Sequence, residues 1–200
     1  MSVISAKYNI PIPEKDFLSY LFDAPFGDKG WPSPEPLLHS TVDSEPCYTI
    51  DEIKDIVRHI GCGLQQLGSQ GSRILLYGEA NIHFPLALLG IMAGGGTCAV
   101  LPPSSVYHII LYLRVMDAGF ILCGPKDLPR VIDAASQVGI PSEHIFVVDE
   151  SVLDTGSGNG QVRHWNWLLN APGGEKYVWP RLGKESKDVE ALMLCTSGYV

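Results

Sequence analysis

Residues 73–101, with the sequence RILLYGEANIHFPLALLGIMAGGGTCAVL, form the stretch that predicts the fold. The stretch opens with a short apolar run, Arg73 to Tyr77, that is rich in strand formers, and closes with a second such run, Thr97 to Leu101. Between them, Asn81 is placed to cap a helix that ends at the glycine triplet 94–96. The apolar residues of this helix recur at helical spacing: Phe84, Leu88, Leu89 and Met92. Strand, helix and strand in this order form the unit from which parallel sheets are built.

The same alternation continues on the C-terminal side of this stretch. Ser105 caps a helix that Gly119 closes, and Asp127 begins another that Gly139 and Pro141 stop. Strand-like runs begin near residues 73, 97, 120 and 145, at intervals of 24, 23 and 25 residues. These runs lack polar alternation, which is typical of parallel strands covered on both faces. The sequence therefore predicts an α/β fold with a mostly parallel sheet and helices on both faces.

On the N-terminal side, Thr49 and Glu52 form the capping-box pattern of a helix that continues to Gly68. Residues 1–48 are less regular: a short helical face between Phe17 and Phe22 precedes a proline-rich segment. We therefore expect two parts, an irregular arm with a short helix over residues 1–48 and an α/β domain over residues 49–200. A partly disordered leader is the alternative interpretation of the arm.

The overall composition bears on three properties: nucleic-acid binding, the cellular compartment and membrane insertion. The 200 residues are 46% hydrophobic and 18% charged, with a net charge of −8 and no basic cluster, so we expect no nucleic-acid partner. The five cysteines are scattered without a C-x-x-C pair, and the first ten residues lack an apolar signal core, which favours a reducing, cytoplasmic compartment. No charged residue lies between Glu79 and Arg114, but prolines and the glycine triplet interrupt this run. We therefore expect two buried elements there and no membrane span.

The C-terminal stretch carries the candidate site. An apolar run of strand length, residues 189–194, leads through Cys195 to Thr196, Ser197 and Gly198. Hydroxyl and backbone N–H groups after a strand bind anions, and a glycine lets the backbone approach them closely. This turn is therefore a candidate phosphate site. A plain strand-to-turn junction is the alternative, because so short a motif is common.

Other candidate residues receive structural roles. The glycine triplet follows a helix and precedes a strand, which is the wrong order for a dinucleotide fingerprint, so we assign it to close helix–strand packing. The six histidines show no metal-ligand spacing, and His83, near a helix start, has no visible partner. Ser104 and Ser105 fit a helix cap better than a nucleophile, and Cys195 fits a buried thiol better than a reactive one. We assign no catalytic residue and no metal ligand.

Four segments in this order and spacing resemble the N-terminal part of the adenylate-forming (AMP-binding) superfamily. That superfamily includes acyl-CoA ligases, 4-coumarate–CoA ligases, luciferases and the adenylation domains of peptide synthetases. The four segments are residues 49–68, 71–74, 81–96 and 188–198. The second is similar to the family's Gly-Asp-Arg-Val and the third to its helix ending in Ala-Gly-Gly. The last is similar to the strand that runs into Ser/Thr-Ser-Gly-Thr-Thr-Gly-x-Pro-Lys-Gly.

The resemblance implies ATP-dependent adenylation of a carboxylic acid, followed by thioester formation with CoA, in secondary metabolism. It implies ATP, Mg²⁺ and CoA as cofactors, and it assigns Thr196, Ser197 and Gly198 to contacts with the β- and γ-phosphates. The chain departs from the family pattern at residues 199–200, where Tyr-Val stands in place of the remaining phosphate loop. It also departs at residues 102–105, where Pro-Pro-Ser-Ser replaces the usual Asn-Pro and acidic residue.

These departures lead us to expect a truncated chain without turnover of its own, because phosphoryl-type transfer depends on positioned cations and hydrogen-bond donors. The alternative is a non-catalytic binding or regulatory remnant that complements a partner chain or self-associates through exposed sheet surface. A nucleotide-linked oxidoreductase domain is a third interpretation, which the position of the glycine triplet disfavours.

Overall fold

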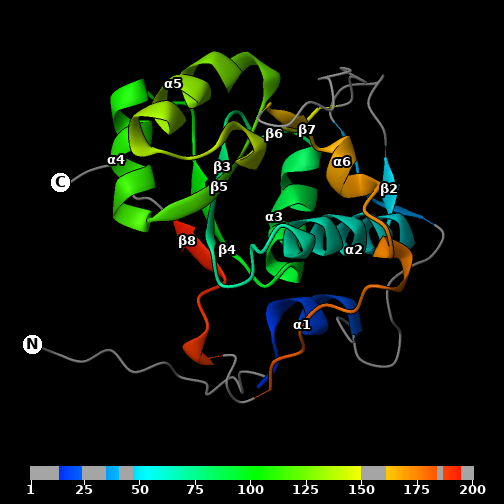
Figure 1. Cartoon of the computed structure of the whole chain (residues 1–200). Helices are drawn as coiled ribbons and strands as arrows, with labels where there is room; N and C mark the ends of the chain where they lie inside the picture. The colour runs from blue at the N-terminus through cyan, green and yellow to red at the C-terminus, as the bar shows by residue number, and fades with distance from the viewer. Residues whose placement is uncertain (1–13, 24–34, 41–46, 150–160, 184–186, 195–200) are drawn as a thin grey trace, which may run out of the picture.

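The computed structural model describes residues 14–23, 35–40, 47–149, 161–183 and 187–194. At its centre is a six-stranded sheet in the order β7-β6-β5-β3-β4-β8, in which every neighbouring pair of strands is parallel. Helices cover both faces of this sheet (Figure 1). The predicted α/β fold with a parallel sheet between helices is therefore confirmed.

The elements follow the predicted segments closely. The large sheet contains β3 (Arg73–Tyr77), β4 (Thr97–Leu101), β5 (Ala118–Cys123), β6 (Ile145–Val147), β7 (Arg163–His164) and β8 (Leu192–Leu194), and a small antiparallel sheet joins β1 (Pro36–Leu38) to β2 (Tyr48–Thr49). The helices are α1 (Phe17–Asp23), α2 (Ile50–Gln66), α3 (His83–Ala93), α4 (Val106–Met116), α5 (Leu128–Val138) and α6 (Asn166–Leu169), with 3₁₀ turns η2 (Pro125–Asp127), η3 (Ser142–His144) and η4 (Gly174–Lys176). Among the described helices, none has the length and apolar character that crossing a bilayer requires. The sequence did not predict β1, β2 and β7, because two or three residues are too few to show a period.

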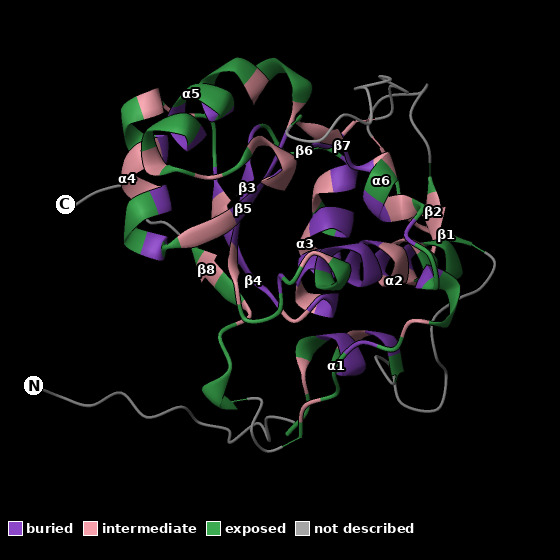
Figure 2. Ribbon diagram, in the orientation of Figure 1, coloured by how far each residue is buried: buried purple, intermediate pink, exposed green. Residues whose placement is uncertain are grey.

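Alternate residues of each strand point to opposite faces of the sheet and fill two separate cores. On β3, Ile74 and Leu76 face a core that α1, α2, α3 and α6 close, whereas Leu75 and Tyr77 face a core that α4 and α5 close. All four of these side chains are fully buried. Figure 2 shows the buried residues along the strands and on the helix faces turned toward them. Burial on both sides explains why the strands read as unbroken apolar runs.

Glycines allow α2, α3 and the adjoining strand to approach one another. A Cβ atom on Gly61 of α2 would lie 2.7 Å from the Ala93 Cβ atom of α3. In the triplet after α3, a Cβ atom on Gly96 would lie 3.2 Å from both the Ser72 carbonyl oxygen and the Ile74 Cδ1 atom. The prediction that the triplet serves close helix–strand packing is therefore confirmed.

The helix ends match the sequence signals with one exception. At the start of α2, the Thr49 hydroxyl accepts the Glu52 N–H at 3.3 Å, and the Glu52 carboxylate accepts the Thr49 N–H at 2.8 Å, which completes the predicted capping box. α4 ends at Met116, and the left-handed residue after it is Asp117, with a φ of 49°. Gly119 already belongs to β5, so the prediction that it closes the helix is wrong. Aspartate can replace glycine at such a position because its short polar side chain tolerates the left-handed conformation.

The described part of the N-terminal region packs on the same body. Leu18 and Phe22 of α1 are buried in the core that includes α2 and α3, and the Phe22 ring lies 5.5 Å from the ring of Trp179. The Asp16 carboxylate accepts the Leu182 N–H at 3.2 Å, so residues far apart in sequence are held together here. The division into an arm over residues 1–48 and a domain over residues 49–200 stays a prediction.

Candidate functional site

The carboxyl ends of the six parallel strands lie along one edge of the sheet, which is where open α/β folds bind their ligands. β8 is the outermost strand on one side and pairs with β4, with Leu194 opposite Val100. β8 therefore ends at the carboxyl edge, beside the end of β4. The predicted phosphate residues, Thr196, Ser197 and Gly198, follow β8 directly in the sequence and lie outside the described residues.

The loop that leaves β4 is held against the end of β3. The buried Tyr77 hydroxyl donates to the Ser104 carbonyl at 2.8 Å and accepts the Ser104 N–H at 2.8 Å. The Ser105 hydroxyl accepts the His108 N–H at 3.4 Å, so Ser105 is the predicted helix cap. The Ser104 hydroxyl oxygen is buried and has no hydrogen-bond partner among the described residues. Since buried hydroxyls normally have partners, Ser104 is a polar group at this edge that can still accept or donate a bond.

A second feature of the carboxyl edge is the crevice between β3 and β5, where the strand order reverses. The chain leaves β3 toward β4 on one side and leaves β5 toward β6 on the other, and such reversals open a crevice between loops. Asp127 fills this crevice: it is 8% exposed, and its Oδ2 atom lies 3.0 Å from the position that a Cβ atom on Gly78 would take. Gly78 has a φ of +133°, so a side chain there would be strained as well as crowded. The exposed Arg130 side chain lies 3.5 Å from the Asp127 carboxylate and forms an ion pair with it.

A buried histidine–carboxylate pair also lies at this edge, and no sequence spacing indicated it. His164 is the last residue of β7, and Asp149 lies just beyond the end of β6; the His164 Nε2 atom is 2.8 Å from Asp149 Oδ1. The Asn166 N–H donates to His164 Nδ1 at 3.2 Å, so the ring proton is on Nε2 and is donated to the carboxylate. The Trp165 indole N–H donates to the Asp149 carbonyl at 2.7 Å. These groups satisfy one another and connect neighbouring strand ends. The only available signal was the position of Asp149 just after a predicted strand.

His83, at the start of α3, also has partners in the structure. Its Nε2 atom lies 3.5 Å from the Tyr48 hydroxyl, and its ring meets the Trp165 ring edge-on, with the ring centroids 5.0 Å apart. The expectation that His83 has no partner is therefore wrong. Tyr48 and Trp165 come from distant parts of the chain, and only packing of β2 and α6 beside α3 brings them together.

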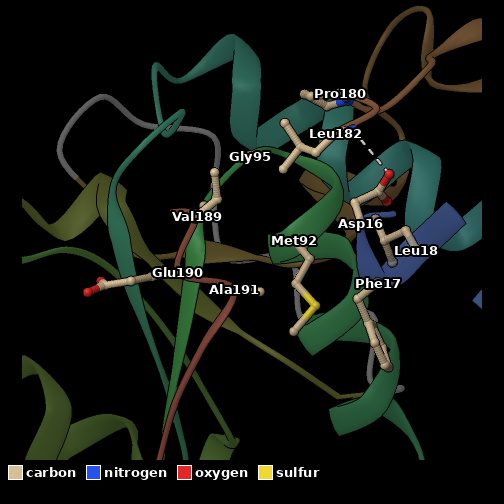
Figure 3. A pocket seen from close by; sticks show the side chains of 11 residues that line it. Asp16, Phe17, Leu18, Met92, Gly95, Pro180, Leu182, Val189, Glu190 and Ala191 are labelled. Atoms are coloured by element: carbon tan, nitrogen blue, oxygen red, sulfur yellow. Dashed lines mark hydrogen bonds between the residues drawn. The ribbon is translucent and has the colours of Figure 1, made fainter. Parts of the chain in front are cut away.

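Two cavities lie at the opposite, amino edge of the sheet. A cavity of about 70 Å³ lies between α1, α3 and the segment that enters β8, with Phe17, Met92 and Ala191 among its lining residues (Figure 3). An open groove of about 480 Å³ is lined in part by Arg73 and Glu190, whose side chains form an ion pair at 3.1 Å. The larger of these two spaces is remote from the edge at which the fold binds ligands. Its lining places the single cation Arg73 among three carboxylates, those of Asp117, Asp188 and Glu190, so the groove is acidic.

Within the described ranges, no group of three or more histidine, cysteine, aspartate or glutamate side chains is placed to bind a metal ion. Burial raises the pKa of the Cys98 thiol to about 12. Burial, with a smaller effect from Asp127, raises the pKa of the Cys123 thiol to about 12 as well. Metal binding requires the thiolate form, so these two strand cysteines act as apolar side chains at neutral pH. Cys195 lies outside the described residues.

Comparison with known proteins identifies relatives of this chain, although no family model matches it. Acyl-CoA ligase azaF from Aspergillus niger is 30% identical over 165 residues, which cover 80% of this chain and 30% of that protein. Phenylacetyl-CoA ligase epaB, also from Aspergillus niger, is 30% identical over 166 residues, which cover 81% of this chain and 30% of that protein. The crystal structure of apo MatB from Rhodopseudomonas palustris has a similar fold, with a TM-score of 0.65 at 16% identity, over 90% of this chain and 32% of that one.

This chain thus spans about 30% of the length of the relatives that it matches. These relatives of the chain are acyl-CoA ligases, and its fold is that of the adenylate-forming ligases.

Proposed function

We propose that the chain forms part of an enzyme that activates a carboxylic acid with ATP as an acyl adenylate and then transfers the acyl group to CoA. The observation that supports this most directly is the direction of β8, which ends beside β4 at the carboxyl edge. A strand that ends there would bring Thr196, Ser197 and Gly198 to the edge at which α/β sheets bind nucleotides. In this proposal, their hydroxyl and backbone N–H groups contact the β- and γ-phosphates.

The described residues offer only part of such a site. At the carboxyl edge they contribute the Ser104 hydroxyl, the paired Asp127 and Arg130, and the Asp149–His164 pair. None of these is a cationic clamp for a triphosphate, and no set of metal ligands lies within the described ranges. Mg²⁺, the adenine and CoA would need groups from other parts of a longer protein. Because loss of one well-placed donor already reduces rates by about 10²–10³-fold, we propose that these 200 residues alone do not turn over.

The test is ATP–pyrophosphate exchange across a panel of carboxylic acids. We expect no exchange from the purified chain. We expect exchange from a chimera in which the part of azaF that follows the matched segment is fused to this chain. In the chimera, Ser197→Ala should reduce exchange by about 10²-fold, whereas Ser136→Ala, on the exposed side of α5, should not.

Each outcome of this assay has a distinct meaning. Exchange by the chain alone would overturn the proposal that it is inactive by itself. A chimera that shows cooperative unfolding but no exchange, or one in which Ser197→Ala has no effect, would overturn the assignment of the phosphate site.

A second candidate function, binding without catalysis, has its own observation. Three apolar residues in or next to β8 are strongly exposed: Val189 at 50%, Leu192 at 41% and Leu194 at 71%. An apolar strand at the edge of a sheet favours pairing with another chain. Light scattering during size-exclusion chromatography would detect self-association, and Leu194→Lys should reverse it. A monomer that binds no hydrophobic dye would count against this function.

We also propose a reducing, cytoplasmic setting for the protein, and secondary metabolism as its role. Supporting the first point, Cys47, Cys62, Cys98 and Cys123 are all present as unpaired thiols in the structure. Free thiols are typical of intracellular proteins. Microscopy of the fluorescently tagged chain in its host would test this location.

A further inference from the structure

The antiparallel pair of β1 and β2 brings a thiol and an imidazole together at the protein surface. Leu38 is paired with Tyr48, so the next residues along the two strands, His39 and Cys47, lie opposite each other. The Cys47 Sγ atom is 3.6 Å from the His39 Nδ1 atom, and both residues are exposed. This contact therefore follows from the register of the strands.

A backbone carbonyl fixes the proton on the His39 ring. The His39 Nε2 atom lies 2.9 Å from the carbonyl oxygen of Pro36. A carbonyl can only accept, so Nε2 carries the hydrogen and donates it, which leaves Nδ1 of the neutral ring as an acceptor. The Cys47 thiol then donates its S–H to Nδ1. A nucleophile, a base in contact with it and a third group that orients the base form the arrangement that activates cysteine nucleophiles.

We propose that Cys47 is a reactive thiol for which His39 is the base, and that its reaction partners are small disulfides such as oxidised glutathione. His39 Nδ1 takes the thiol proton, and the Cys47 sulfur attacks one sulfur of the disulfide. The S–S bond of the partner breaks as a mixed disulfide forms between Cys47 and one glutathione. The second glutathione leaves as a thiolate and takes the proton from His39, so one disulfide replaces another and no further oxidant is needed.

The other cysteines in the described ranges lack these features. Cys98 and Cys123 are buried in strands, and burial raises the pKa of each thiol to about 12. Cys62 is buried, and its thiol donates to the Pro172 carbonyl at 3.6 Å. Reactive cysteines need both access and a group that promotes the thiolate. Among the cysteines of the described ranges, only Cys47 combines the two.

The experiment measures the alkylation rate of each cysteine in the intact chain. The chain is treated with iodoacetamide, quenched at intervals, digested and analysed by mass spectrometry, so that each cysteine-containing peptide reports its own rate. Cys47 should react more than about threefold faster in the folded chain than in the chain unfolded by urea, because an ordinary thiol is only a few per cent ionised at neutral pH. Cys98 and Cys123 should react only after unfolding.

A histidine variant separates activation from simple exposure. His39→Gln should lower the folded-state rate at Cys47 to the unfolded-chain rate, whereas His108→Gln, at another exposed histidine, should leave it unchanged. Continued protection of Cys98 in His39→Gln shows that this variant is folded. In a parallel arm with oxidised glutathione, Cys47 should gain one glutathionyl group faster in the native chain than in His39→Gln.

Three results would overturn the proposal. They are a folded-state rate at Cys47 no more than about threefold above the unfolded rate, an equal rate in His39→Gln, or alkylation without any glutathione transfer. None of these readouts depends on ATP or on an acid, so the outcome is independent of the proposed ligase function.

Discussion

The crossing of α2 and α3 predicts a large cost for one added methyl group, Gly90→Ala. A Cβ atom on Gly90 would lie 2.4 Å from the Ile60 Cγ2 atom and 2.5 Å from the Ile60 Cβ atom. Carbon atoms in contact normally lie about 3.5–4.0 Å apart, so the helices would have to separate by about 1 Å. Ile60 is fully buried, and its Cβ atom is bonded directly to the backbone. Because this β-branched side chain is also stiff about χ1, it cannot move aside.

The size of the effect follows from two opposing contributions. Overpacking a core costs about 1–3 kcal/mol, and this rigid contact belongs at the upper end of that range. Alanine in place of glycine inside a helix stabilises the folded state by about 1 kcal/mol, because alanine has the higher helix propensity. The net loss should therefore be about 2 kcal/mol, or about 4–8 °C in the melting temperature of a protein of this size.

Urea unfolding followed by circular dichroism measures this loss as a lower midpoint with an unchanged slope. Gly139→Ala is the matched control: Gly139 has a φ of +83° and nothing within 4 Å of an added Cβ atom, so its cost should be conformational only, about 1–2 kcal/mol. The double variant Gly90→Ala, Ile60→Ala should lose at least about 1 kcal/mol less stability than the sum of its two single variants. The double variant Gly139→Ala, Ile60→Ala should lose the full sum of its two single variants. A stabilising Gly90→Ala, or full additivity with Ile60→Ala, would show that the contact between residue 90 and Ile60 does not limit how closely α2 and α3 pack.

Two further predictions concern the carboxyl edge and acid stability. Tyr77→Phe should cost about 2 kcal/mol, because it leaves the Ser104 N–H and carbonyl without their buried partner, and it should speed hydrogen exchange at Ser104. Burial raises the pKa of the Asp16 carboxyl, but hydrogen bonds from Ser19 and Leu182 together outweigh it and hold the pKa below the ordinary 3.8. The backbone N–H bond from the start of α2 likewise lowers the pKa of Glu52 below 4.5. A carboxyl whose pKa is lower in the folded chain than in the unfolded chain stabilises the fold at pH values above its ordinary pKa. This stabilisation is lost as the pH falls through the folded-state pKa. The double variant Asp16→Asn, Glu52→Gln should therefore lose less stability between about pH 5 and pH 3 than the unchanged chain, and an equal loss would contradict the assignment.

Much of the fold was predictable because each helix and strand is marked by a pattern that spans only a few neighbouring residues. The strand bounds 73–77 and 97–101 and the helix start at Thr49 agree with the structure, since apolar period and capping residues occupy only a few neighbouring positions. The end of α4 was misplaced because Asp117 adopts the conformation usually given to glycine. The strands β1, β2 and β7 were missed because they contain only two or three residues.

The candidate phosphate site at residues 196–198 stays a prediction, because these residues lie outside the described ranges. The sequence did predict the strand before them, which forms and pairs with β4. The Asp149–His164 pair and the Cys47–His39 pair join residues from different elements, so no spacing within one segment indicates them. The place of Asp127 against Gly78, where the strand order reverses between β3 and β5, depends on that order, so the sequence did not indicate it either.

Local patterns were thus sufficient to assign the main helices and strands and to predict a sheet covered on both faces, because period, capping and apolar content are properties of neighbouring residues. They did not determine the strand order, the place of β8 beside β4, or contacts such as the ion pair between Arg73 and Glu190. Many orders of the same strands satisfy the same local pattern. The order seen here follows from the packing of two cores against the sheet, which joins residues that the chain itself keeps far apart.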